Sequence, residues 1–333
     1  MIEAVDLTKH YGAKVAVDHI SFTVEPGTVT GFLGPNGAGK STTMRMIMGL
    51  DKPTTGRVTV NGRPYRELAA PLCEVGALLD AKGLHPSRSA RTHLTQLAIS
   101  NGIPTNRVDE VLELTGLTSV AKKRVKGFSL GMGQRLGIAA ALLGDPQTLI
   151  FDEPVNGLDP EGVKWVRETC RNLASQGRTV FISSHLMSEM AQTADQLIVI
   201  GRGRIITSGP VNEVIAAATA DRVRVASPQA TRLAELMASH KLAARPVEPS
   251  VLETTDTTAA AIGELAATHG IVLHELTTIR ASLEEAYLTL TKDSVEYAVG
   301  EHTPADPGPA GPRPTGGAAP RPSSPTRHSA RAA

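Results

Sequence analysis

The sequence predicts an α/β fold with a parallel sheet at its core, and three observations lead to it. A β-rich stretch at 29–33 runs into a glycine loop, and a Met-rich stretch without helix breakers at 41–50 follows as a helix would. Short apolar stretches indicate further strands at 148–151, 179–183 and 196–200. A helix expected at 161–175, closed by Gly177, separates the first two of these strands, and such alternation favours a parallel sheet.

Two additions to this pattern are expected. The dipeptide Asn61-Gly62 follows an alternating stretch at 57–60, which predicts a tight type I′ turn and an antiparallel N-terminal subdomain. Helical stretches at 90–99 and 108–114, bounded by turn signals, predict a compact helical insertion at about 81–135. Both additions belong to a first domain predicted at 1–220.

A second pattern begins at residue 221 and predicts a small α+β accessory domain at 221–299. Its strands are expected at 222–226, 244–247, 251–254 and 271–276, and its helices at 231–239 and 258–267. This β-α-β-β-α-β order is typical of a ferredoxin-like domain. Residues 300–333 are dominated by Pro, Gly, Ala, Ser and Arg, so a disordered tail is predicted there.

Composition limits the possible classes of function. The 333 residues are 41% hydrophobic with a formal net charge of +1, so bulk charge favours neither nucleic acid nor an anionic membrane as the main partner. Charged residues interrupt the N-terminus, which argues against a signal peptide, and no apolar run approaches the ~20 residues that span a bilayer. If the protein serves transport, its pore is therefore expected on another chain. Cys73 and Cys170 are expected to be buried small hydrophobes.

One glycine-rich segment has the spacing of a phosphate-binding loop, because it follows a predicted strand and opens a predicted helix. Its backbone N–H groups can turn toward phosphate oxygens, and the helix N-terminus adds a favourable dipole field. Lys40 would bridge the β- and γ-phosphates, and Ser41 would ligate Mg²⁺. The alternative is a glycine-rich turn before a solvated lysine. The expected nucleotide-binding residues here are Gly34, Pro35, Asn36, Gly37, Ala38, Gly39, Lys40, Ser41 and Thr42.

A predicted strand downstream ends in two adjacent carboxylates, Asp152 and Glu153. Successive side chains of a strand point different ways, so Asp152 can face a metal while Glu153 faces an attacking water. Two acids at a strand end can also merely cap the next helix. Their position after a phosphate loop, at parallel-sheet spacing, favours a catalytic role.

These segments form an ordered series. The phosphate loop is followed by Phe-Ser-Leu-Gly-Met-Gly-Gln-Arg at 128–135, by the two acids, by Asn-Gly-Leu-Asp at 156–159 and by His185. In order and spacing the series resembles that of the ABC ATPases, over about residues 1–215. The resemblance implies an ABC cassette in the P-loop NTPase class, with ATP and Mg²⁺ as cofactors and with active sites shared between two cassettes.

The resemblance also implies roles for single residues. Tyr11 would stack on adenine, Asp152 would hold Mg²⁺, and Asp159 would couple the two sites of the dimer. Tyr11 could instead be an ordinary half-buried aromatic, and His185, which would contact the γ-phosphate, could be a strand-end histidine satisfied by its neighbours. The expected catalytic residues are Glu153 as general base, His185 and Lys40.

Ser129 and Gly131 match the signature that would close over the γ-phosphate from the opposite subunit. Ser129 could equally cap the helix expected to start near Met132, and both roles could coexist. The sequence departs from the family at Leu130, where glycine is usual, and at Met132, where glutamine is usual. A side chain at Leu130 restricts the approach of the backbone to phosphate.

A further departure is Asp80, which ends the segment Val-Gly-Ala-Leu-Leu-Asp where the family usually has glutamine. A carboxylate still ligates Mg²⁺ but adds charge and lacks an amide donor, which affects communication with a membrane subunit. It would also stand as a third acid near Asp152 and Glu153. The expected metal ligands are Ser41, Asp80 and Asp152.

The sequence therefore predicts the ATP-hydrolysing subunit of an ABC exporter. It would form a homodimer or pair with another ATPase subunit, act on a separate integral membrane permease, and have no nucleic acid partner. It would be cytoplasmic, held on the inner face of the membrane by that permease. Residues 281–288 resemble the tail region of ATPases that serve exporters of antibiotics, lantibiotic-type peptides or lipids, although a plain dimerisation or packing helix is favoured there over a substrate site.

Two alternative functions stay open. The first is a soluble ABC ATPase that acts on ribosomes or nucleic acid, for which two cassettes, a long coiled coil or basic arms would be expected. The second is a nucleotide-gated module with little hydrolysis, suggested by Leu130, Met132 and Asp80.

Overall fold

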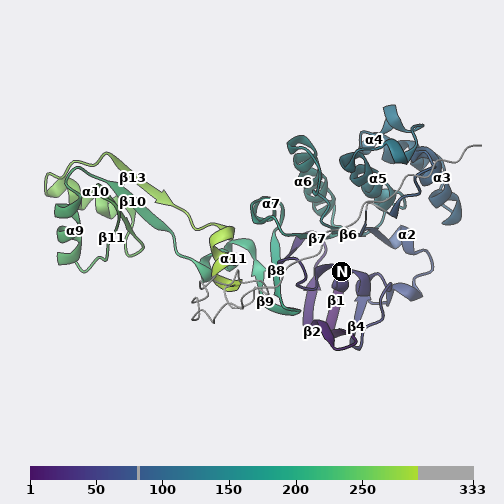
Figure 1. Ribbon diagram of the computed structural model, residues 1–333, viewed down its shortest axis with the longest axis horizontal. Coiled ribbons are helices and arrows are strands. Elements are labelled where there is room, and N and C mark those ends of the chain that lie inside the picture. The colour runs from purple at the N-terminus through teal and green to yellow at the C-terminus, as the bar shows by residue number, and fades with distance from the viewer. Residues whose placement is uncertain (81–82, 292–333) are drawn as a thin grey trace, which may run out of the picture. The chain divides into compact units, whose positions relative to one another are not determined.

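The computed structural model describes residues 1–80 and 83–291 (Figure 1). The tail expected at 300–333 lies outside these residues, so its predicted disorder stays a prediction. None of the helices in the described part of the chain combines the length and the apolar character that crossing a bilayer requires.

A six-stranded sheet forms the centre of the cassette. Its strands are β3 (Val29–Leu33), β5 (Val75–Leu78), β6 (Thr148–Asp152), β7 (Thr179–Ser184), β8 (Gln196–Gly201) and β9 (Arg204–Pro210). They lie in the order β5-β6-β7-β3-β8-β9, with all pairs parallel except β8 and β9. The predicted parallel core is confirmed, and its expected strands match to within one residue at each end.

Alternate residues of these strands face two separate hydrophobic clusters. On one face of the sheet, Phe151 packs in the cluster that includes residues of the helices. On the other face, its neighbour Ile150 packs in the cluster that includes residues of the N-terminal strands. On that second face the rings of Phe22, Phe32 and Phe181 pack against one another at centroid distances of 5.3–5.9 Å. The helices beside the sheet are α1 (Lys40–Ile47), α6 (Pro160–Ser175), α7 (Met187–Thr193) and α8 (Val211–Ala218).

A three-stranded antiparallel sheet forms the N-terminal subdomain, with the order β2-β1-β4 (Figure 1). Its strands are β1 (Ile2–Tyr11), β2 (Lys14–Val24) and β4 (Thr55–Val60). Asn61 and Gly62 have φ values of 50° and 80°, as a type I′ turn requires. After this turn only one isolated bridge forms, between Val60 and Arg63. The strand β4 pairs along its length with β1.

The helical insertion contains α3 (Ala90–Ser100), α4 (Asn106–Leu114) and α5 (Leu130–Leu142), after the short helix α2 (Pro71–Glu74). Short 3₁₀ turns lie at Tyr65–Glu67, Thr118–Val120 and Val125–Gly127. Helix α5 lies against β5 with little space between them. A Cβ at Gly76 would collide with the carbonyl oxygen of Ala141, and one at Gly137 would collide with Leu78. The glycines thus allow the insertion to dock directly on the edge of the central sheet.

A second α+β unit follows along the chain, with its own hydrophobic cluster around Val225, Leu233 and Ile262. Its elements are β10 (Arg222–Ala226), α9 (Ala230–Ser239), β11 (Arg245–Glu248), β12 (Val251–Thr254), α10 (Ala259–Thr268) and β13 (Glu275–Ile279). They occur in the expected β-α-β-β-α-β order, and the antiparallel sheet has the strand order β11-β12-β10-β13. The domain boundaries at 220 and 299 stay predictions.

The last strand of this unit corrects the sequence analysis, which expected it at 271–276. In the structure β13 begins at Glu275, because its register is set by pairing with β10, where Ala226 faces Glu275 and Arg222 faces Ile279. Apolarity placed the strand too early, since the polar Thr277 and Thr278 lie within the ladder.

The helix α11 (Leu283–Thr291) is a packing helix, as favoured from its sequence. Leu283 and Tyr287 are buried in the same cluster as the helices of the central sheet, and α11 contacts α7 and α8.

The two cysteines are unpaired thiols: Cys170 is fully buried and Cys73 is half-buried. Burial raises the pKa of the Cys170 thiol to about 12, so Cys170 behaves as a small apolar residue.

Candidate nucleotide-binding and catalytic site

The phosphate loop leads from the buried end of β3 into α1. A Cβ at Gly34 would collide with the carbonyl oxygen of Ile200, so the loop passes β8 at a distance that only glycine permits. Gly39, the N-cap of α1, has a φ of 107°, and a Cβ there would lie 2.6 Å from the carbonyl oxygen of Ala16. The first backbone N–H groups of α1 therefore open toward the loop without a side-chain cap, as an anion site requires.

The Lys40 side chain is only 6% exposed and folds back over the loop. Its ammonium donates to the carbonyl oxygen of Gly34 at 2.7 Å and to that of Pro35 at 3.3 Å. It also lies 3.5 Å from the Glu153 carboxylate. A buried cation held by carbonyl dipoles and one carboxylate places positive charge where phosphate oxygens would bind.

The acids at the end of β6 meet residues from β7 and from the loop after it. The Ser183 hydroxyl donates to Asp152 and accepts from the backbone N–H of Glu153 at 3.0 Å. His185 Nδ1 lies 2.8 Å from a carboxylate oxygen of Glu153. Glu153 has a φ of 50°, a left-handed conformation that is strained for a non-glycine residue. The two adjacent carboxylates have different partners, since Asp152 accepts from Ser183 whereas Glu153 lies beside Lys40 and His185.

A pocket of about 350 Å³ lies between the phosphate loop and the start of β2. Tyr11, with 47% of its surface exposed, and Glu153 contribute to its walls. Lys14 and Ala16 also line it, and no sequence signal pointed to them, because the β1–β2 hairpin is brought to the loop only by folding. The full lining consists of Tyr11, Lys14, Ala16, Pro35, Asn36, Gly37, Gly39, Lys40, Ser41, Thr42 and Glu153.

Ser129, Gly131 and Asp159 do not line this pocket. The Ser129 hydroxyl caps α5 by accepting from the backbone N–H of Met132 at 3.2 Å, so the capping alternative is present in the structure. Asp159 caps α6 by accepting from the backbone N–H of Gly162 at 3.0 Å. The signature and the 156–159 loop lie next to one another, because a Cβ at Gly131 would stand 3.3 Å from the carbonyl oxygen of Gly157. Both lie outside the phosphate-loop pocket.

Comparison with known proteins identifies the family. Residues 17–156 match the sequence family described as ABC transporter. The bacitracin transport ATP-binding protein BcrA of Bacillus licheniformis is 44% identical over 217 residues, which cover 64% of this chain and 71% of that protein. The uncharacterized ABC transporter ATP-binding protein YhcH of Bacillus subtilis is 35% identical over 304 residues, which cover 90% of this chain and 99% of that protein. The chain belongs to the ABC transporter ATP-binding proteins.

Solved structures agree with this assignment. A structure described as the ATP binding subunit of an ABC transporter has 25% sequence identity and a TM-score of 0.60, covering 65% of this chain and 92% of that one. The predicted ATPase subunit of a transporter is thus confirmed, in preference to an ATPase that acts on ribosomes or nucleic acid. Residues 221–284 match a further family, described as a domain of unknown function.

The role of Asp80 as a metal ligand beside Asp152 stays a prediction. Asp80 lies just beyond the end of β5, is exposed, and does not line the pocket of this ABC cassette. Within residues 1–80 and 83–291 no three side chains of the His, Cys, Asp or Glu type converge on a possible metal position. Asp80, Asp152 and Glu153 therefore form no such group within the described residues, although β5 and β6 are parallel neighbours with Leu78 opposite Phe151.

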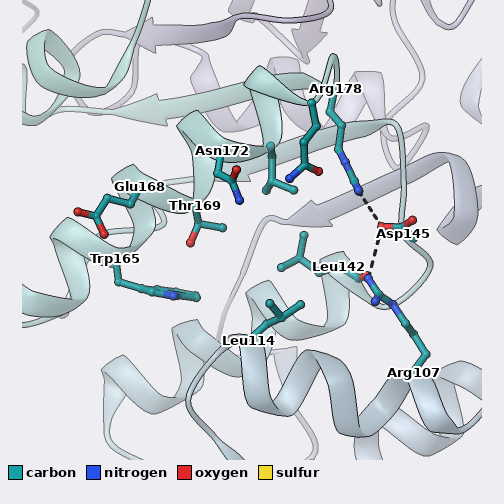
Figure 2. Close-up of a pocket in the computed structure, with 11 residues that line it drawn as sticks. Arg107, Leu114, Leu142, Asp145, Trp165, Glu168, Thr169, Asn172 and Arg178 are labelled. Atoms are coloured by element: carbon teal, nitrogen blue, oxygen red, sulfur yellow. Dashed lines mark hydrogen bonds and ion pairs between the residues drawn. The ribbon is translucent and has the colours of Figure 1, made fainter.

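A second pocket, of about 540 Å³, lies between α4, the end of α5 and α6 (Figure 2). At one end Arg107 and Arg178 both bind Asp145, at 3.4 and 2.9 Å, and Trp165 lies toward the other end (Figure 2). None of the residues expected to bind nucleotide or metal lines this pocket. The motif-bearing site of the ABC cassette is therefore the smaller pocket at the phosphate loop.

Proposed function

We propose that this ABC ATPase hydrolyses ATP in the phosphate-loop pocket, with Glu153 as the general base. The attacking water would form a bond to the γ-phosphorus and lose a proton to the Glu153 carboxylate, while the bond to the leaving oxygen of ADP breaks. The observation that carries the proposal is that Lys40 and His185 both reach Glu153, at 3.5 and 2.8 Å. The Glu153 carboxylate thereby lies between Lys40, which would bind the phosphates, and His185, which would contact the γ-phosphate.

Ser41 and Asp152 would hold Mg²⁺, with Asp80 as a third predicted ligand. Bound Mg²⁺ would supply positive charge to the phosphate oxygens. A hydroxyl and a carboxylate oxygen are the kind of sparse, hard donor set that Mg²⁺ uses when phosphates and water complete its shell. The Ser183 hydroxyl would orient Asp152 through the hydrogen bond it donates to that carboxylate.

Two cassettes would complete each site. Ser129 and Gly131 lie outside the pocket of their own chain, so they would act on nucleotide held by the phosphate loop of the opposite cassette, with Asp159 at the junction. The pair would be a homodimer or a combination with another ATPase subunit. Closure around ATP would be favoured because ATP binds the closed pair more tightly than the open one.

The substrate class proposed is a peptide antibiotic such as bacitracin, exported by a separate permease. The 44% identity to a bacitracin transport ATP-binding protein supports this proposal. The ATPase would lie in the cytoplasm, on the inner face of the membrane, and contact the permease there.

Phosphate release measured over a range of protein concentrations tests the shared site. Specific activity should rise with concentration and depend sigmoidally on ATP. Activity independent of concentration, with a hyperbolic dependence on ATP, would mean that one chain suffices.

Transport is tested separately: the permease is identified by co-purification from gently solubilised membranes, and ATP-driven uptake of bacitracin is measured in inverted vesicles that hold both subunits. Hydrolysis without bacitracin uptake would reject the substrate class and leave the ATPase intact.

A further inference from the structure

The Tyr11 ring is tied to helix α1 through a charged pair. Its hydroxyl donates to the Asp51 carboxylate at 2.8 Å. Arg45, in the last turn of α1, holds the same carboxylate through Nε at 2.7 Å and Nη2 at 3.3 Å. The guanidinium of Arg45 holds the pKa of Asp51 below its ordinary value, so the carboxylate stays ionised and the phenol makes a charge-assisted bond.

One face of the same ring is covered by Lys9. The Lys9 ammonium lies 5.0 Å from the ring centroid, within cation–π range, and donates to the carbonyl oxygen of Lys52 at 2.7 Å. Lys9 is thus anchored on the backbone next to Asp51. Tyr11 also lines the phosphate-loop pocket and is 47% exposed, so part of this residue is open to a ligand in that pocket.

These contacts bring little burial of apolar surface. Tyr11 is 47% exposed, and Asp51 and Arg45 are 17% and 49% exposed, so the cluster is no part of the hydrophobic core. Ion pairs this exposed add at most about 1 kcal/mol to folding. What the cluster does fix is the position of an exposed aromatic ring relative to α1, the helix that begins with Lys40 and Ser41.

We propose that Arg45, Asp51 and Lys9 are positioning residues that hold the Tyr11 ring as a platform for the nucleotide base. The proposal rests on the proposed function, in which Tyr11 stacks on adenine. Helix α1 would thus position two parts of the site. The phosphate loop leads into its first turn, and Arg45 in its last turn holds the Tyr11 ring through Asp51. Asp51 itself does not line the pocket, so it acts through Tyr11 and touches no nucleotide.

The test compares two ligands, ATP and inorganic tripolyphosphate, which carries the phosphates but no base. Affinities of the full chain are measured by calorimetry, with melting temperatures to verify folding. Tyr11→Ala should weaken ATP binding about tenfold or more, as loss of a base–aromatic stack implies. Asp51→Asn, which leaves the ring but removes the charge from the tether, and Tyr11→Phe, which removes the hydroxyl, should each weaken ATP binding about three- to tenfold. Tripolyphosphate binding should not change.

A matched control is Asp18→Asn. Asp18 is 20% exposed and accepts from Arg204 at 2.7 Å, but it lies outside the pocket, so both ligands should bind as to the parent. In a Tyr11→Ala background, Asp51→Asn should have no further effect on ATP affinity.

Two results would overturn the proposal. If Asp51→Asn weakens tripolyphosphate as much as ATP, Asp51 acts on the phosphate loop or on folding and not on the base platform. If Tyr11→Ala leaves ATP affinity unchanged while Lys40→Ala lowers it, Tyr11 is no platform for the base, but the nucleotide site of the proposed function stands.

Discussion

The Nδ1 of His185 lies 2.8 Å from a carboxylate oxygen of Glu153, just beyond the adjacent ends of the paired strands β7 and β6. Glu153 also faces Lys40, so its carboxylate is held from two sides by groups that lie far away in the sequence. A carboxylate with both neighbours in place can accept a proton from water and keep its orientation. Replacing Glu153 therefore tests whether its carboxylate is the base in hydrolysis.

Glu153→Gln should bind ATP normally and hydrolyse it hardly at all, because an amide cannot take a proton from water. ATP should then stabilise a dimer, seen by size exclusion, since turnover no longer releases it. The control is Glu74→Gln, whose carboxylate pairs with Arg63 outside the site and whose loss should leave turnover unchanged. Near-parental turnover in Glu153→Gln would remove Glu153 as the base and favour another proton acceptor.

Lys40→Ala should weaken ATP binding itself, because the ammonium neutralises β- and γ-phosphate charge beside backbone dipoles. Calorimetry measures the affinity. Lys164→Ala is the control: this lysine is 69% exposed and pairs along α6 with Glu168. Equal ATP affinity in Lys40→Ala and the parent would show that Lys40 serves the loop carbonyls and not the nucleotide.

The side chain of Leu130, 53% exposed, packs over Gly157, where a Cβ would collide with it. Gly157→Ala should therefore push the signature and the 156–159 loop apart and lower ATPase activity more than about tenfold, a barrier increase of about 1.4 kcal/mol. Replacing Leu130 with Ala in the same chain should restore part of that activity by making room for the new methyl group.

The control for this prediction is Gly177→Ala. Gly177 has a φ of 85°, close to the 75° of Gly157, but has open space where the Cβ would go. Both changes bring the same left-handed backbone strain, on the order of 1–2 kcal/mol of stability. Only Gly157→Ala should change ATPase activity at temperatures where both variants are folded. Equal activity losses in the two variants would trace the effect to strain alone.

Asp80 tests the link between hydrolysis and transport. Asp80→Gln should keep ATPase activity within about tenfold, about 1.4 kcal/mol in the barrier, because an amide oxygen can still act as a polar ligand. Asp80→Ala should mainly lose transport coupled to that hydrolysis. Both activities are measured together in vesicles that hold the ATPase and its permease. If Asp80→Ala changes neither, the strand end does not take part in coupling, in line with its exposed position away from the pocket.

Local patterns were sufficient where the constraint itself is local. The phosphate loop was predicted because its glycine spacing between a strand and a helix, with the left-handed turn at Gly39, is contained within a few residues. The helix at 161–175 was predicted to within one residue of α6, because its apolar face and the glycine after it are sequence signals. The strand β13 was misplaced, since its start depends on the partner strand β10.

The sequence by itself determined the order of strands and helices, the nucleotide loop and the family, because periodicity, turn residues and motif spacing act over short stretches of chain. Only the tertiary structure decided which of the expected site residues meet. It brought Glu153 to Lys40 and His185, tied Tyr11 to Asp51, and left Ser129 and Asp80 outside the pocket. The physical reason is that these distances depend on sheet order and on how closely distant backbones can approach, which no short stretch of sequence specifies.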